Sequence, residues 1–424
     1  MNQIWNRNFP QWYVINEVKQ LCSRGFPLAR LWSLRIVFAS AYVLRLFFAA
    51  SFFHHFDLGT WLIYTSGIAE GKWNVYDPHS YPYPHVYGYP PAFLFATIYP
   101  VGVLRRVLNL GDMEQMFLIR AILSGFDLAT GYLIYQLVYS KTGRPRSGLL
   151  ACILFLFNPF VILVSSIWGM MDSVPTFFAT SALLLHLRKR NDLSALSLSS
   201  AICAKSYPIY LLPCFLFLQP NLRGRMRYFL VATGLAAVLS APFAISSPAS
   251  YFYGSAIWEL KRGDYFGIYM FFVPSTGWWD SPTLKLAISF VALICLTILL
   301  FRYRVRGRRR LNLEGTLAFY SAFVMLLYST SMFHSQFLLL IAPVAAVYIG
   351  MRLSTITWAS YSTLAFSLAM LFWITEWQIF SGGVWVTNPT MYTAAQLFNF
   401  FVPVASFYIL IEMVRVIRRS LHSD

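Results

Sequence analysis

The sequence predicts an all-α polytopic membrane protein, and three observations lead to that fold class. Hydrophobic residues make up 58% of the 424 residues, whereas charged residues make up only 12%. That charged share is about half the share in soluble globular chains. Aromatic residues reach 18%, which suits surfaces that contact lipid and its interface. The apolar residues also form runs long enough to cross about 30 Å of hydrocarbon as helices.

These apolar runs predict a bundle of about twelve transmembrane helices. Most of the runs are long enough to span alone. They cover residues 31–53, 117–139, 147–166, 172–187, 227–247, 284–302, 315–332, 335–351, 355–379 and 391–414. Two shorter runs, 193–205 and 207–219, meet at Lys205-Ser206-Tyr207-Pro208. We expect them to form a pair of short or tilted helices joined at a break.

Basic residues lie in short clusters between the apolar runs, which is the pattern of cytoplasmic loops. The clusters span residues 141–146, 188–190, 223–227, 302–310 and 415–419. The basic amino terminus is placed on the same inner side, so the first helix leads to an outer segment, residues 54–89. Because the formal charge of +17 is scattered among these loops, we expect the bilayer and no nucleic acid as a partner.

An odd number of crossings must separate the outer segment 54–89 from the inner cluster at 141–146. We therefore interpret residues 90–107 as a re-entrant or interfacial segment. Arg105 and Arg106 are the residues that fit this interpretation least well. A second large outer loop is predicted at 248–283. The inner loops are short and basic, whereas the outer ones are long and chemically varied. We therefore expect one transmembrane domain over residues 1–424, with its chemistry on the outer side.

Several charged residues lie in or beside the predicted helices, where charge is costly and faces the bundle interior. Arg120 and Asp127 lie two turns apart on one helix face, about 10 Å along the axis, so each needs a partner elsewhere. A purely structural contact between helices would explain both. Arg35 is expected to snorkel at the inner boundary, and the deeper Arg45 either lines a cavity or snorkels outward.

Three further candidates lie where predicted helices end. Asp172, in Trp168-Gly169-Met170-Met171-Asp172, either caps the following helix or belongs to a site. Lys205, at the helix break, needs an anion such as a lipid phosphate, unless it snorkels from a short helix end. His334 lies in Phe333-His334-Ser335-Gln336-Phe337 at another outer helix junction, where a hydrogen-bonded structural role is the simpler interpretation.

The order of these motifs resembles the GT-C superfamily of membrane glycosyltransferases, and in particular the polyprenyl-phosphate-mannose-dependent mannosyltransferases. Phe56-Asp57-Leu58-Gly59, then Gly71 to Tyr76, then Tyr87-Gly88-Tyr89-Pro90-Pro91 are similar to the first outer loop of that family. The segments around Arg120 and Asp127, Trp168 to Asp172, Lys205 to Pro208, and His334 to Phe337 are similar to its later motifs. The resemblance runs from about residue 30 to residue 345.

The resemblance implies a GT-C-like bundle with a large first extracytoplasmic loop, and an inverting transfer of a hexose, mannose in this family. The donor would be a polyprenyl-phosphate-linked sugar and the acceptor a lipid or a glycan. Asp57 would be the catalytic base. The residues implied to bind substrate are Lys205, His334, Asp172, Arg120, Asp127, Asp77, Tyr89 and Gln336.

The sequence departs from the family's pattern at one position. Metal-using relatives carry a second Asp where this chain has Gly59, so we expect no metal ion. We expect no other cofactor either, because Lys, Arg or His can neutralise a single lipid phosphate. Under the same resemblance the protein would work in a bacterial or archaeal plasma membrane or in the endoplasmic reticulum, with its site on the extracytoplasmic side.

Three other functions fit parts of the pattern. A transporter or lipid flippase would also use broken helices and buried charges, although the two halves of the sequence show no internal repeat. A GT-C enzyme with another lipid-linked sugar, such as glucose or arabinose, would carry the same motifs. A non-catalytic scaffold subunit would not need a row of buried ionisable residues.

Overall fold

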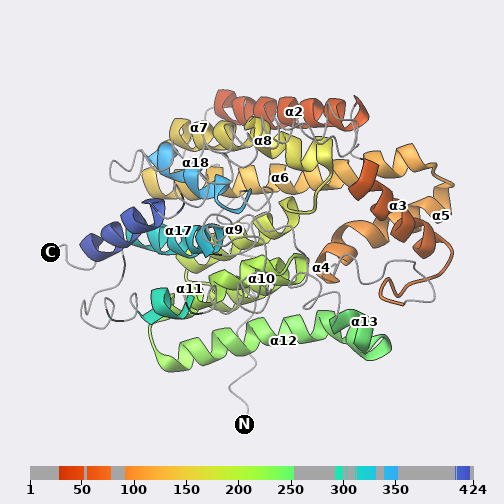
Figure 1. Cartoon of the computed structure of the whole chain (residues 1–424). Helices are drawn as coiled ribbons and strands as arrows, with labels where there is room; N and C mark the ends of the chain where they lie inside the picture. The colour runs from red at the N-terminus through yellow and green to blue at the C-terminus, as the bar shows by residue number, and fades with distance from the viewer. Residues whose placement is uncertain are drawn as a thin grey trace, which may run out of the picture.

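The computed structural model describes a helical chain in several stretches. They are residues 28–51, 55–77, 91–252, 313–330, 339–351 and 408–420, together with residues 291, 293–298, 302, 311 and 406. Within these stretches the elements are helical and the structure contains no strand. Figure 1 shows the long helices lying side by side along one direction, as in a membrane bundle.

The first layer of the bundle consists of α2 (Leu28–Ser51), α6 (Asp112–Thr142) and α7 (Pro145–Leu156) (Figure 1). Short α8 (Pro159–Ile162) and the π-helical turn η2 (Leu163–Trp168) continue α7 after a 50° bend. Asn158 ends the first part and caps the second, because its side chain accepts a hydrogen bond from the Phe160 N–H at 2.9 Å. The predicted single span 147–166 is therefore a bent pair of helices.

The centre of the bundle is built from α9 (Ser173–Leu187) and α10 (Asn191–Ala204), which pack against each other along their length (Figure 1). At Lys205 the chain leaves the helix in an extended conformation. It continues as the 3₁₀ turn η3 (Tyr207–Tyr210) and α11 (Leu211–Leu218). The predicted break at Lys205-Ser206-Tyr207-Pro208 is confirmed.

The remaining long helix, α12 (Leu222–Ser246), packs against α10 and runs into short α13 (Pro248–Phe252). Helix α17 (Leu313–Thr330) contacts α11, and α18 (Ala342–Met351) packs against α7 and α6. One large core cluster joins α7, α9, α10, α11, α17 and α18. The predicted spans at 284–302, 355–379 and 391–414 lie wholly or largely outside the described residues.

One end of the bundle collects the basic loops between helices, and we call it the basic end. The Arg188 guanidinium, after α9, donates to the Gln136 side chain near the end of α6 at 3.4 Å. Arg227, on the first turns of α12, forms an ion pair with Asp192 at the start of α10. The clusters at 141–146, 188–190 and 223–227 therefore share one side, as the positive-inside pattern predicts.

The opposite end, which we call the α3 end, carries a separate helical module at the right of Figure 1. Helix α3 (His55–Ala69) lies beside α4 (Pro91–Phe93), the π-helical turn η1 (Leu94–Ile98) and α5 (Tyr99–Leu108). The segment expected to be a loop thus begins with a 15-residue helix. Buried Leu58, Trp61, Thr65 and Ile68 recur at helical spacing along it.

Helix α6 explains why this module lies beyond the bundle. Its 31 residues measure about 46 Å, whereas the hydrocarbon layer is about 30 Å thick, so its first turns project beyond the layer when Lys141 lies at the inner surface. Helices α3 and α5 pack against this projecting part. Residues 91–108 have the length and composition of a membrane span, and their interpretation as an interfacial segment stays a prediction.

Four helices among the described residues are long and apolar enough to cross a membrane, and the bent pair α7 with α8–η2 would be a fifth. The four are Ser33–Ser51, Pro91–Leu108, Asp112–Thr142 and Leu222–Ser246. The protein is therefore an integral membrane protein with several spans.

Candidate functional site

The turn that joins η2 to α9 is the point where the α3 module meets the bundle. Gly169 adopts a left-handed conformation with φ of 79°, and its carbonyl accepts a hydrogen bond from the Trp61 indole N–H at 3.2 Å. A Cβ atom at this position would lie 2.7 Å from Leu58 and 3.2 Å from the Cγ of Arg120. Only glycine therefore lets α3, α6 and this turn approach so closely.

Arg120 is buried on α6 beside this turn, and its Nε donates to the Met116 carbonyl at 3.0 Å. Asp57 lies in the first turn of α3, directly before Leu58. Two residues predicted for the site, Asp57 and Arg120, thus belong to helices that meet at Gly169.

Asp172 and Lys205 form a buried ion pair three residues beyond that turn. The Lys205 Nζ donates to both carboxylate oxygens of Asp172, at 2.9 and 3.2 Å. The carboxylate is fully buried and the lysine side chain is 11% exposed, with its Nζ 5.7 Å from the centre of the Tyr207 ring. The irregular backbone after α10 makes this possible, because it turns Lys205 toward the start of α9.

This pair removes one of the two alternatives left open for each of its members. Asp172 precedes α9 but makes no capping hydrogen bond to the helix backbone, so the capping interpretation is wrong. Lys205 does not snorkel. Its ammonium group pairs with Asp172, so the two side chains form a neutral buried pair.

A second buried ion pair joins α2 to α6 at membrane depth. The Arg45 Nε lies 3.5 Å from an Asp127 carboxylate oxygen, and both side chains are at most 1% exposed. Nearby hydroxyl groups form hydrogen bonds between α6 and η2, with Ser124 and Ser166 3.0 Å apart. Asp127 has its partner on another helix, as expected. The expectation that Arg45 lines a cavity or snorkels outward is wrong, because Asp127 holds it inside the bundle.

The chain after α3 is anchored to the far end of α12. Gly71, with φ of 88°, ends α3, as glycine commonly does after a helix. The Asn74 side-chain amide donates to the hydroxyls of Ser246 and Ser247, at 3.0 and 2.8 Å. Tyr76 packs edge-on against Phe243 and Tyr251. These contacts close residues 71–77 over the α3 end of the bundle.

Burial in this cluster raises the pKa of Tyr76 well above its usual value, so its hydroxyl stays protonated at neutral pH.

The remaining predicted site residues have different outcomes. The Asp77 backbone N–H donates to the Asn74 carbonyl at 3.1 Å, and Asp77 is half-buried. Tyr89, His334 and Gln336 lie outside the described residues.

Sequence reasoning missed Trp61, Gly169 and Asn74 as residues that shape this end. Trp61 falls in a segment expected to be a loop, yet it is buried and lies at helical spacing from Leu58 and Thr65. A test for helical periodicity within residues 54–70 would have found it. Asn74 left no such signal, because its partners lie more than 170 residues away.

Comparison with known proteins gives a family and a fold. Residues 38–279 of the 424 match the family model described as GPI transamidase subunit PIG-U. The match covers more than half of the chain. It runs from α2 to beyond α13 and includes Asp57, both buried ion pairs and the turn at Gly169.

Two solved structures are similar to this one. They are crystal structures of ArnT from Cupriavidus metallidurans, one bound to undecaprenyl phosphate and one in the apo state. Each has a TM-score of 0.50, and each match covers 91% of this chain and 76% of the ArnT chain. The sequence identity is 13% for the bound structure and 14% for the apo structure. At such low identity the likeness concerns the fold, and it confirms the expected GT-C-like helical architecture.

Proposed function

Because the chain belongs to the PIG-U family and has a GT-C-like fold, we propose that its α3 end binds a polyprenyl-phosphate-linked sugar and transfers the sugar to a lipid or glycan acceptor. The sugar we propose is mannose, the hexose that the resemblance to the mannosyltransferases implies. The reaction takes place on the extracytoplasmic side of a bacterial or archaeal plasma membrane or of the endoplasmic reticulum.

The observation that carries this proposal is the convergence at Gly169. The first turn of α3, which includes Asp57, lies beside the turn at Gly169, because the next residue, Leu58, would contact a Cβ at that glycine. Arg120 contributes a buried cation at the same turn, and the Asp172–Lys205 pair follows three residues later. A base and cations held at one end of a membrane bundle are the groups that transfer from a lipid phosphate requires.

The chemistry is a single displacement at the anomeric carbon. Asp57 takes the proton of the acceptor hydroxyl while that oxygen bonds to the anomeric carbon from the face opposite the phosphate. The bond between the anomeric carbon and the phosphate oxygen breaks with both electrons leaving on the phosphate. The configuration of the sugar is therefore inverted, and the products are the glycosylated acceptor and the polyprenyl phosphate.

Arg120 and Lys205 have separate tasks in this proposal. Asp172 neutralises Lys205 and fixes its ammonium group, so the lysine offers hydrogen-bond donors without adding net charge. Arg120 supplies the positive charge that favours the departing phosphate. His334, Gln336 and Tyr89 are proposed to complete the substrate contacts, and the polyprenyl chain stays among the lipid-facing helices.

A second function is favoured by the family match. The matched model describes a subunit of a GPI transamidase, so this chain could hold a phosphate-linked glycolipid for another protein without catalysing transfer itself. Such a protein needs the phosphate contacts but no base. The role of Asp57 therefore separates the two functions.

Asp57→Asn is the change that tests the proposal, because it preserves shape while removing basicity. We expect sugar transfer from a labelled polyprenyl-phosphate donor to fall by about 10² to 10⁴, since general-base catalysis contributes about that much, with donor binding retained. Glu70→Gln is a matched control in the same segment and should transfer at a near-normal rate. Donor binding without transfer by the wild type, across several acceptors, would favour the glycolipid-binding subunit. Normal transfer by Asp57→Asn would refute the assigned base.

A further inference from the structure

A separate cavity with a charged lining lies where α3 and the turn after it meet α5 and the start of α6. It has a volume of about 400 Å³, and the residues that give it its chemistry are Ser66, Glu70, Lys72, Arg105 and Asp112. Ser66 follows Asp57 by nine residues, or about 13 Å along α3. The cavity is therefore distinct from the turn at Gly169, and the transfer proposed above makes no use of it.

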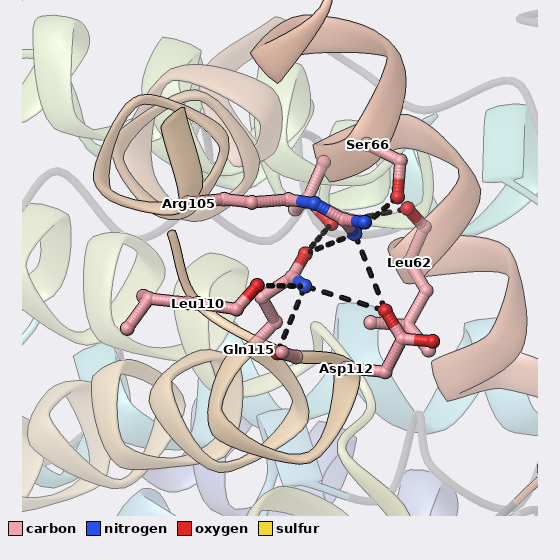
Figure 2. Close-up of polar contacts among 8 residues, drawn as sticks. Leu62, Ser66, Arg105, Leu110, Asp112 and Gln115 are labelled. Carbon is pink, nitrogen blue, oxygen red and sulfur yellow. Dashed lines mark hydrogen bonds and ion pairs between the residues drawn. The ribbon is translucent and has the colours of Figure 1, made fainter. Parts of the chain in front are cut away.

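Arg105 forms a fixed wall of this cavity where three helices meet (Figure 2). Its Nη1 donates to the Gln115 side-chain oxygen at 3.0 Å, to Asp112 at 3.3 Å and to the Ser66 hydroxyl. Buried Gln115 in turn donates to the carbonyls of Leu110 and Gly111, at 3.2 and 2.9 Å. The guanidinium group is thus held in place by α3, α5 and α6 together.

The cavity carries two positive and two negative groups, arranged as two ion pairs. Lys72 pairs with Glu70 at 2.7 Å, and Arg105 pairs with Asp112 at 3.3 Å. The hydrogen bond from Lys72 lowers the pKa of Glu70, so this carboxylate is charged at neutral pH. Exposed pairs of this kind contribute little to stability. A ligand that carries both charges could therefore replace the contact between exposed Lys72 and Glu70 at little cost, while Arg105 stays in place.

An apolar surface borders the charged groups. Leu62 and Ile63 line the cavity itself. On α5, Leu104 and Leu108 are exposed on the flank of the helix next to Arg105. The α3 module packs against the part of α6 that projects beyond the hydrocarbon layer, which puts the cavity at the lipid interface. A fitting ligand is therefore amphipathic, with a head group that is charged but neutral overall.

We propose that this cavity binds the head group of a zwitterionic phospholipid of the phosphoethanolamine type. The phosphate accepts hydrogen bonds from Arg105 and Lys72, and the primary ammonium donates to Glu70 and Asp112. The acyl chains lie along the exposed apolar residues of α5. An anionic head group would leave both carboxylates opposed to its charge, and a choline group has no N–H to donate.

The test measures binding of phosphatidylethanolamine, phosphatidylcholine and phosphatidylglycerol with identical acyl chains to the full-length purified protein by native mass spectrometry. We expect phosphatidylethanolamine to bind about tenfold more tightly than either other lipid, the effect of one charge-assisted interaction. Glu70→Gln should abolish this preference without touching the contacts between helices, and Arg105→Gln should weaken binding of all three lipids. Arg227→Gln, which opens an exposed ion pair at the basic end, is the matched control and should change nothing.

Equal binding of phosphatidylglycerol and phosphatidylethanolamine would overturn the proposal, as would an unchanged preference in Glu70→Gln. Soluble phosphorylethanolamine is added as a competitor to identify the source of the head group. Displacement of the lipid by an equimolar amount would assign the site to a free head group and refute a lipid ligand. Because no measurement uses sugar transfer, the result is independent of the role of Asp57.

Discussion

The two buried ion pairs among the described residues are similar in chemistry but occupy different surroundings. Arg45–Asp127 joins two regular helices, α2 and α6, and lies wholly inside the bundle. Asp172–Lys205 joins a turn to a helix break, and its lysine keeps 11% of its surface exposed. Irregular backbone at membrane depth is tolerated only where protein or a cavity surrounds it. We therefore infer a structural role for the first pair, and the proposed function gives the second pair a role in substrate binding.

The largest expected effect comes from breaking the first pair on one side only. Arg45→Met leaves the Asp127 carboxylate buried without a counter-charge, which typically costs about 3–5 kcal/mol. We expect a large fall in the midpoint of thermal unfolding, measured in detergent. The double variant Arg45→Met with Asp127→Asn removes both charges and should recover most of that stability. A single variant as stable as the wild type would break the comparison, because it would mean that Asp127 does not depend on Arg45.

A smaller effect is expected at the turn beside the second pair. Gly169→Ala adds a Cβ that would lie 2.7 Å from Leu58, at a left-handed φ of 79°. Strain of this kind costs about 1–3 kcal/mol. The clash pushes α3 away from Arg120, so we expect sugar transfer to fall more than stability does.

Gly143→Ala is the matched control for that change. Gly143 also has a positive φ, 63°, but lies at the basic end with open space around the added Cβ. It should lose some stability and keep its specific transfer activity. Equal losses of activity in the two variants would contradict a special role for the turn at Gly169.

The sequence predicted the helices and the helix break that carry these charged residues, but it did not predict which residues form ion pairs with each other. Hydropathy located most described helices, and the Lys205-Ser206-Tyr207-Pro208 motif located the break, because both depend on local composition. The partners of Lys205 and Asp127 were not predictable, since they come from packing between residues 33 and 82 positions away. Helix α3 was missed because residues 54–89 were interpreted as an outer loop, although Leu58, Trp61, Thr65 and Ile68 already had helical spacing.

The central claim is tested most directly by removing each ion pair as a unit. The two matched variants are Arg45→Met with Asp127→Asn, and Lys205→Met with Asp172→Asn, because replacing both members leaves no buried charge uncompensated. Binding of undecaprenyl phosphate to each purified protein is measured by native mass spectrometry, beside its thermal unfolding. The account predicts near-wild-type binding for the first variant and at least about tenfold weaker binding for the second, with both folded. Weaker binding in the first variant and normal binding in the second would contradict it.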